Sequence, residues 1–216
     1  MTLTRRRLIA GGVALLAAPR AALAREPAVV RVRFVTAAGS FIVALDTRRA
    51  PATAANFLAY VDDERFDGTT FYRAARSKRL PGTGFVQGGI RTDARRILPP
   101  FPLETTAKTG LRHVDGAISM ARGATAAAAG GNFFICIGAA PHMDARPGFQ
   151  GYAVFGKVIA GMPVLKRILA VPTGGGFDSM KGQMIMKPIP IVRAVRMDGQ
   201  KRPTGRPRPW LLLRRR

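Results

Sequence analysis

Apolar and polar residues alternate along the chain after residue 28. Residues 30–34 alternate between apolar and charged side chains, and residues 41–45 resume the same period after a turn-forming segment at 37–40. A period of two is typical of a strand with one buried face. Two such segments joined by a short turn are typical of a hairpin. The sequence therefore predicts a β-hairpin over residues 30–45.

Two segments show the spacing of short amphipathic helices. Pro51 is followed by apolar residues at 54, 57, 58 and 61, and Pro163 is followed by apolar residues at 164, 165, 168 and 169. Apolar residues three and four positions apart form one face of a helix. Proline is favoured at the first helical position. We therefore expect one helix after each proline.

The other apolar segments are short and strand-like. They lie at residues 71–73, 85–87, 113–121, 132–137, 152–158 and 189–195. The alanine-rich stretch at 123–131 has glycines at both ends and no apolar face, so we expect a loop there. Closely spaced strands with only two helices predict a mainly β protein, a closed antiparallel barrel of eight strands.

The first 24 residues are typical of an export signal. They contain no acidic residue, a basic cluster at 5–7, an apolar run at 8–18 and a small-residue cleavage site before residue 25. Residues 4–9 resemble a twin-arginine signal. The alternative is an uncleaved anchor, but eleven residues reach across about half of a bilayer. We expect a periplasmic or exported protein, cleaved near Ala24, with its folded domain at 25–199.

The chain is strongly basic, with a formal charge of +23, or +19 without residues 1–24. This charge is typical either of an arginine-rich surface or of a nucleic-acid or membrane binder. The arginines are scattered and lack the interleaved aromatic residues that stack bases, so no nucleic acid is expected. Residues 200–216 are typical of a disordered basic tail, which is either solvated or touches an anionic membrane surface or an acidic partner. A monomer is expected.

The sequence lacks the common catalytic motifs. It has no phosphate-binding loop, no His-Glu-x-x-His and no Gly-x-Ser-x-Gly, and one cysteine and two histidines make a metal site improbable. The single cysteine also excludes an intramolecular disulfide, and Cys136 is expected in the core. His113, Asp115 and Ser119 would lie too far apart along one strand to form a triad.

Polar residues nevertheless stand beside aromatic residues in three predicted strands. Arg73, Gln87 and Asn132 occupy such positions. Alternation places Arg73 on the same face as Phe71, and Asn132 on the same face as Phe134. Hydrogen-bond donors beside an apolar floor are typical of a binding surface, although a surface ion pair explains Arg73 alone equally well.

Five segments, in this order, resemble the cyclophilin-type peptidyl-prolyl cis-trans isomerases. They are Phe-Tyr-Arg at 71–73, Phe-Val-Gln-Gly-Gly at 85–89, Ala-Ile-Ser-Met-Ala at 117–121, Gly-Asn-Phe-Phe-Ile at 131–135 and Val-Phe-Gly-Lys-Val at 154–158. The helix start at 51–57 matches as well, and the resemblance covers residues 28–197. It implies a cyclophilin-like barrel that accelerates rotation about X-Pro bonds in proline-containing polypeptides. It implies no cofactor and no metal.

The resemblance also implies roles for individual residues. Arg73 would donate a hydrogen bond to the prolyl nitrogen, and Gln87 would orient Arg73. Met120, Phe134 and Met143 would form the floor of the proline pocket, while Ala121 and Asn132 would hold the substrate backbone. The full set of implied substrate-binding positions is Phe71, Phe85, Gln87, Met120, Ala121, Asn132, Phe134, His142, Met143 and Tyr152.

The chain departs from the family pattern at several positions. Six extra residues separate Arg73 from Gln87, and Gly84 stands where the family has a pocket phenylalanine. Either Phe85 turns in and replaces that ring, or the pocket is wider. The other substitutions are Asn132 for glutamine, Tyr152 for histidine, Arg122 for asparagine and His142 for tryptophan. Weak inhibition by cyclosporin is expected from the change at His142.

Two functions follow from this comparison. The first is an isomerase that assists the folding of exported proteins. The alternative is a cyclophilin-like module of weak activity that binds proline-containing segments, which Gly84 and Asn132 favour and which the retained Arg73 opposes.

Overall fold

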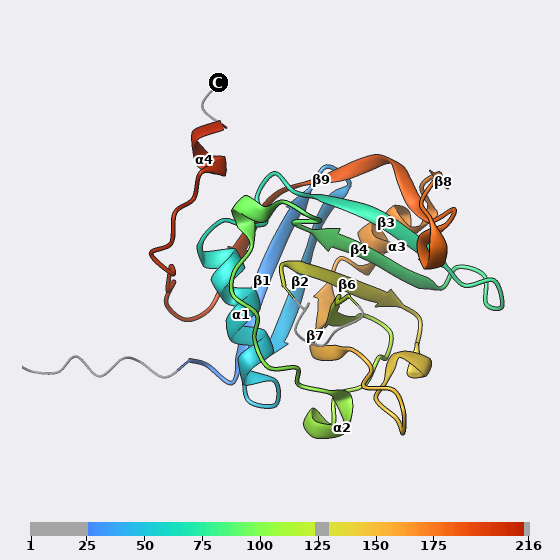
Figure 1. The fold of residues 1–216 in the computed structure, drawn as a ribbon, viewed down its shortest axis with the longest axis horizontal. Coiled ribbons are helices and arrows are strands. Elements are labelled where there is room, and N and C mark those ends of the chain that lie inside the picture. The colour runs from blue at the N-terminus through green and yellow to red at the C-terminus, as the bar shows by residue number, and fades with distance from the viewer. Residues whose placement is uncertain (1–25, 124–129, 214–216) are drawn as a thin grey trace, which may run out of the picture.

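The computed structural model of the chain describes residues 26–123 and 130–213, which contain a closed β-barrel (Figure 1). The expected signal peptide at 1–24 lies outside the described residues, as does most of the loop expected at 123–131. The strands are β1 (Val29–Thr36), β2 (Gly39–Asp46), β3 (Thr70–Arg76), β4 (Gly84–Gly89), β5 (Ala117–Met120), β6 (Asn132–Ile137), β7 (Ala153–Ala160), β8 (Thr173–Gly174) and β9 (Met184–Arg196).

Eight of these strands form the barrel. They follow one another in the order β1, β2, β7, β5, β6, β4, β3 and β9, and the pairing of β9 with β1 closes the ring. The short β8 pairs only with β9. All of the pairings are antiparallel. The predicted closed eight-stranded antiparallel barrel is therefore confirmed.

The β1–β2 hairpin contributes one wall of the interior. Val32 is paired with Val43, and the rings of Phe34 and Phe41 stack with 4.9 Å between centroids. Burial alternates along β1 as its sequence predicts. The interior is rich in aromatic residues: its buried rings are Phe34, Phe41, Phe57, Tyr60, Phe66, Phe71, Phe133 and Phe155. Such rings bury a large apolar area, so this cluster stabilises the barrel.

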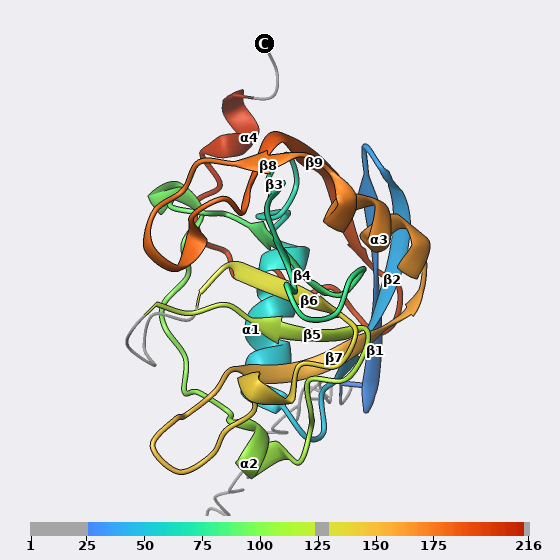
Figure 2. The ribbon, with the colours of Figure 1, turned by 90° about the vertical axis from the view of Figure 1, so that its right-hand side faces the viewer.

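Both predicted helices are present and pack against this interior. The helices are α1 (Pro51–Asp62), α2 (Thr106–Thr109), α3 (Met162–Ala170) and α4 (Trp210–Leu213), with 3-10 turns at Ala94–Arg96, Pro141–Met143 and Asp178–Met180. Figure 2 shows α1 behind the strands and α3 beside β2. The two very short helices, α2 and α4, were not predicted. Within the described part of the chain, no helix is long and apolar enough to span a membrane.

The strand predicted at 113–121 is shorter in the structure. It begins only at Ala117, because Gly116 adopts a φ of 77° and turns the chain just before it. A positive φ of this size is readily adopted only by glycine. His113 therefore lies in a loop that folds back toward the strand.

Strand β3 contains a β-bulge. Phe71 is paired with Gly88 and Arg73 with Gln87, so Tyr72 is an extra residue between the two pairs. A bulge of one residue breaks the strict alternation of faces. Phe71 therefore points into the interior, fully buried, while Arg73 lies on the outside. The prediction that these two residues share a face is wrong for this reason.

The C-terminal segment also differs from the disordered tail that the sequence predicts. The backbone N–H of Arg202 donates to Asp62 at 2.9 Å, and that of Thr204 donates to Asp63 at 2.8 Å. Trp210 is only 2% exposed. The segment from 202 to 210 thus runs past residues 62–65, at the C-terminal end of α1, and ends in a buried aromatic anchor. The basic, proline-rich composition does not reveal this.

Candidate functional site

A second apolar cluster lies on the outer face of the barrel, apart from the interior. In β6, Phe133 and Ile135 point inward, so Phe134 and Cys136 point outward. The buried members of the outer cluster are Ala117, Phe134, Cys136, Ala140 and Val154, and Phe85, Leu111, Ala121, Met143 and Tyr152 pack around them. We call this group the outer cluster.

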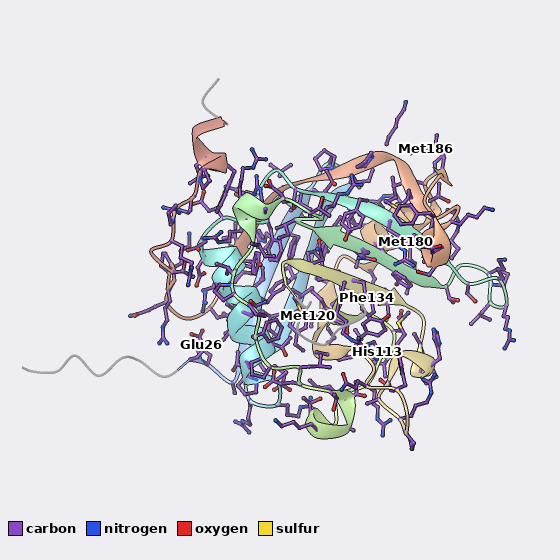
Figure 3. The ribbon with its side chains drawn as sticks, viewed as in Figure 1. Glu26, His113, Met120, Phe134, Met180 and Met186 are labelled. Carbon is purple, nitrogen blue, oxygen red and sulfur yellow. The ribbon has the colours of Figure 1, made fainter. Side chains whose placement is uncertain are left out.

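Phe134 is the centre of the outer cluster. Its ring centroid lies 5.3 Å from that of Phe85 and 5.4 Å from that of Tyr152, which meets it edge-on. His113 stacks parallel to it, with 5.8 Å between centroids. Figure 3 shows Phe134 and His113 together near β6, with Met180 on the chain segment that leads into β9. The arrangement gives an aromatic floor with walls of Phe85 and Tyr152.

The backbone at Gly84 explains why no phenylalanine stands there. Gly84 has a φ of 144°, and a Cβ atom on it would lie 2.0 Å from the carbonyl oxygen of Ala75. No side chain fits at that position. The aromatic ring is supplied instead by Phe85, one residue later, which contacts Phe134, so of the two alternatives Phe85 replaces the missing ring.

Arg73 extends along the outer face beside this floor. Its Nε and Nη2 donate to Oε1 of Gln183 at 2.9 and 2.7 Å, and Nη2 also donates to the carbonyl of Ser179 at 3.3 Å. Nη1 donates to Oε1 of Gln87 at 3.1 Å. A guanidinium carries five N–H donors. Among the described residues no partner meets the fifth donor, the second N–H of Nη1.

A chain of side-chain hydrogen bonds holds Gln87 in place. Nε2 of Gln87 donates to the hydroxyl of Tyr72 at 2.9 Å, and that hydroxyl donates to Oδ1 of Asn132 at 3.2 Å. Asn132 in turn accepts from the N–H of Arg91 and donates to its carbonyl. Arg73 presents only donors, so the amide oxygen of Gln87 must face it, and the amide NH₂ then faces the Tyr72 hydroxyl. The Tyr72 hydroxyl is thus a component of the site that the sequence analysis did not identify.

Burial shifts the pKa values of two side chains at this site, Arg73 and Tyr72. It lowers the pKa of Arg73 from its ordinary value, which is so high that the side chain stays charged. Burial also raises the pKa of Tyr72 to about 12, so its hydroxyl stays protonated and able to donate. The Cζ atom of Arg73 lies 4.9 Å from the ring centre of Phe85, a cation–π contact that further orients the guanidinium.

The structure brings most of the predicted site residues together. Arg73, Gln87 and Asn132 belong to the polar part, and the apolar part contains Phe85, Ala121, Phe134, Met143 and Tyr152. Two predicted residues are elsewhere: Phe71 and Met120 are buried in the barrel interior. Phe71 lies there because of the bulge, and Met120 because alternation along β5 turns it inward. His142 is exposed on a 3-10 turn, where its carbonyl accepts a hydrogen bond from Arg146.

His113 and Ser119 form a closer pair than the sequence predicts. Nε2 of His113 lies 3.0 Å from Oγ of Ser119, and Nδ1 lies 2.7 Å from a carboxylate oxygen of Asp144. The turn at Gly116 makes this contact possible, and the acid is Asp144 rather than Asp115. Both Ser119 and His113 are buried, so the hydroxyl meets no substrate. The array is therefore a structural support beneath Phe134.

Two further observations concern metal binding and a cavity on another part of the molecule. Across the described residues, no group of three or more His, Cys, Asp and Glu side chains could hold a metal ion. A cavity of about 810 Å³ lies between α1 and the two ends of the described chain, lined in part by Arg48, Leu58 and Arg196. It shares no residue with the outer cluster or with the Arg73 network.

Comparison with known proteins identifies the family. A family model for the cyclophilin type peptidyl-prolyl cis-trans isomerase/CLD matches residues 31–196. The chain belongs to the cyclophilins. This cyclophilin is 37% identical over 142 residues to peptidyl-prolyl cis-trans isomerase A of Dickeya dadantii, covering 66% of this chain and 72% of that protein. It is 33% identical over 164 residues to peptidyl-prolyl cis-trans isomerase cyp18 of Streptomyces antibioticus, covering 74% and 93%.

Solved structures show the same fold. A Cryptosporidium parvum cyclophilin matches with a TM-score of 0.61 at 24% identity, covering 80% of this chain and 99% of that one. A second structure of that protein, determined in the presence of the dipeptide Ala-Pro, matches with a TM-score of 0.62 at 23% identity, covering 78% and 99%. The family resemblance read from the sequence is confirmed, and this cyclophilin is a peptidyl-prolyl cis-trans isomerase.

Proposed function

We propose that this cyclophilin accelerates X-Pro rotation in exported proteins, with Arg73 donating a hydrogen bond from Nη1 to the prolyl nitrogen. The single observation that carries the proposal is the hydrogen bonding of the Arg73 guanidinium. Four of its N–H donors are held by Gln183, Ser179 and Gln87, and the fifth stays available beside an aromatic floor.

The chemistry of the X-Pro bond explains why one donor is enough. Amide resonance opposes rotation with a barrier of about 20 kcal/mol, and no bond breaks. In the twisted transition state the nitrogen lone pair is uncoupled from the carbonyl and accepts a hydrogen bond. A planar amide nitrogen accepts none, so the bond from Arg73 favours the transition state over both ground states. A hydrogen bond from a charged donor contributes about 1.5–3 kcal/mol.

The outer cluster supplies the binding surface for the proline. Phe134 would contact the proline ring, with Phe85 and Tyr152 on its sides, and this apolar surface keeps water from the donor. The Ala-Pro dipeptide used with the Cryptosporidium parvum protein supports a substrate of this kind. Proline-containing polypeptides are therefore the proposed partners.

The proposal places the protein outside the cytoplasm. The support is in the sequence, where residues 1–24 combine a basic cluster, an apolar run and a cleavage site. The single Cys136 suits an oxidising compartment, because it is buried and burial raises the pKa of its thiol to about 12. Cell fractionation with mass measurement of the mature N-terminus tests this. Uncleaved protein found only in the cytoplasm would contradict it.

The test of the reaction is cis-trans exchange in a short Ala-Pro peptide, followed by NMR. The mature protein is compared with Arg73→Ala and with Arg79→Ala, which removes an exposed arginine. We expect acceleration by the wild type and by Arg79→Ala, and a loss of about 10- to 100-fold in Arg73→Ala. Equal rates for wild type and Arg73→Ala would refute the assignment of the donor. Peptide resonances that shift without any acceleration would instead identify a proline-peptide binder.

A further inference from the structure

We infer that Gln183 is a positioning residue for the isomerase reaction, holding the guanidinium of Arg73 so that one N–H of Nη1 faces the substrate. The inference rests on the proposed role of Arg73. Oε1 of Gln183 accepts from both Nε and Nη2 of Arg73, at 2.9 and 2.7 Å. This contact covers the edge of the guanidinium opposite to the donating one.

The amide of Gln183 has only one orientation that satisfies its neighbours. Its Nε2 donates to the carbonyl of Ser179 at 2.9 Å. In the flipped orientation, an NH₂ group would face two donors of Arg73 and an oxygen would face a carbonyl. Both contacts would be repulsive. The oxygen of Gln183 therefore points at Arg73 whenever the segment 179–183 is folded.

The backbone fixes the position of Gln183 as well. Its carbonyl accepts from the N–H of Ala74 at 2.9 Å, directly after Arg73, and its own N–H donates to Met180 at 3.0 Å. Gly182 donates to Gly175 and closes the loop. Gln183 is thus attached to β3 next to the residue that it orients.

The side-chain amides of Gln87 and Gln183 both hold Arg73, but they restrict its movement differently. Gln87 accepts one N–H of Nη1 and is in turn held by Tyr72. With that contact alone, the planar guanidinium would still turn about its Cδ–Nε bond and swing on its flexible stem. Gln183 holds Nε and Nη2 together and removes that freedom. A catalytic group displaced by about 1 Å commonly loses up to about 100-fold in rate.

The experiment compares Gln183→Leu with Gln200→Leu, which changes an exposed glutamine with no hydrogen bond among the described residues. Exchange in the Ala-Pro peptide is measured over a range of peptide concentrations, together with the ¹H–¹⁵N resonance of Arg73 Nε. We expect Gln183→Leu to lower kcat about 10-fold with KM within about twofold of wild type. The Nε–H resonance should shift and exchange faster with water. Gln200→Leu should match wild type in all three measurements.

The possible results separate the inference from the function on which it rests. A wild-type kcat in Gln183→Leu overturns the inference, and so does a lower kcat with an unchanged Nε–H resonance. If Gln183→Leu does not fold, Gln183→Asn replaces it, because its shorter side chain keeps the amide but does not reach Arg73. A wild-type rate in Arg73→Ala would refute the proposed function itself, whatever Gln183→Leu does.

Discussion

The side-chain amide of Gln87 donates a hydrogen bond to the hydroxyl of Tyr72, at 2.9 Å. This contact decides which end of the amide faces Arg73. Tyr72 is available for it because it is the bulge residue of β3, whose side chain lies on the same outer surface as Arg73. The bulge in β3 thus positions Tyr72, which orients Gln87, the residue that accepts a hydrogen bond from Arg73.

Removing the Tyr72 hydroxyl should therefore lower the rate of isomerisation. In Tyr72→Phe, Gln87 loses the acceptor that fixes its amide, and Asn132 loses one donor. A neutral hydrogen bond contributes about 1 kcal/mol, so we expect kcat/KM to fall about fivefold. The measurement is prolyl exchange by NMR.

The control for this change is Thr92→Val, which removes an exposed hydroxyl outside the outer cluster and the Arg73 network. No hydrogen bond of that hydroxyl is found among the described residues. This variant should keep close to the wild-type rate. Equal losses in the two variants would show that the hydroxyl of Tyr72 has no special role.

Restoring the family's phenylalanine at residue 84 should damage the protein. Gly84→Phe, and already Gly84→Ala, would place Cβ against the carbonyl of Ala75 in a backbone conformation that favours glycine. We expect a loss of at least about 2 kcal/mol in the free energy of unfolding, or about 4–8 °C in Tm. Gly130→Ala is the control, because the nearest atom to its Cβ would be 3.9 Å away. If Gly84→Phe were as stable as wild type and faster, the role given to Phe85 would be wrong.

Much of the fold could be predicted because its signals are local. The hairpin of β1 and β2 follows from alternation, and α1 and α3 follow from apolar spacing after a proline. The family blocks also indicated Arg73, Gln87 and Phe134, which the structure brings together on one outer surface. These residues lie within the strands that carry the blocks, so their order in the sequence is enough to find them.

The errors arise where one residue changes the geometry. Alternation assigns Phe71 to the face of Arg73, because nothing in the local sequence marks Tyr72 as a bulge. A strand extended over residues 113–119 would keep His113 apart from Ser119, but the turn at Gly116 interrupts that strand. In both cases the residues on either side follow the alternation of a strand, and a single residue between them, Tyr72 or Gly116, interrupts it.

Other contacts join residues that are far apart in the sequence, so no local pattern predicts them. Gln183 is 110 residues from Arg73 along the chain and stands in a glycine-rich segment without a family block. Trp210 meets Arg65 and Arg96 only after the C-terminal segment has run past the C-terminal end of α1. A segment rich in arginine and proline has the composition of a disordered chain. Only the structure therefore shows that Trp210 contacts Arg65 and Arg96.

The buried His113 should make the protein less stable in mild acid. Burial lowers its pKa below the ordinary value of 6.5, although Asp144 opposes that shift and His142 adds to it; Arg112 lies 3.7 Å from Asp144. Below pH 6.5 the unfolded chain therefore binds a proton that the folded protein resists. The free energy of unfolding should be constant above this pH and fall as the pH drops through the folded pKa.

Urea unfolding between pH 7.5 and pH 5 checks this expectation. His113→Gln removes the titrating group. In this variant the free energy of unfolding should therefore change little with pH in this range, whatever its absolute value. His142→Gln changes the other histidine of the chain, which is exposed, and should keep most of the wild-type slope, because His142 makes the smallest contribution to the His113 shift. If His113→Gln kept that slope too, the acid sensitivity would have to come from another group.

The C-terminal segment should contribute to the stability of the barrel. Trp210 is 2% exposed, and its ring centre lies 4.7 Å from Cζ of Arg65 and 5.0 Å from Cζ of Arg96. Arg65 is itself buried and paired with Asp63, so the indole covers a charge that has little access to water. Cation–π contacts of this desolvated kind contribute up to about 2 kcal/mol each. The indole N–H has no hydrogen-bond partner among the described residues, which offsets part of that gain.

Trp210→Ala should therefore lower the free energy of unfolding by about 3 kcal/mol, at the lower end of the usual cost of removing a buried aromatic residue. Phe177→Ala is the matched control, because that ring is 71% exposed and its removal should change the stability by less than about 0.5 kcal/mol. Both are measured by urea unfolding at neutral pH. A chain stopped before Gln200 should lose at least as much stability as Trp210→Ala, because it also removes the hydrogen bonds to Asp62 and Asp63. Unchanged stability in both Trp210→Ala and the shortened chain would mean that the segment is free in solution, as its composition suggests.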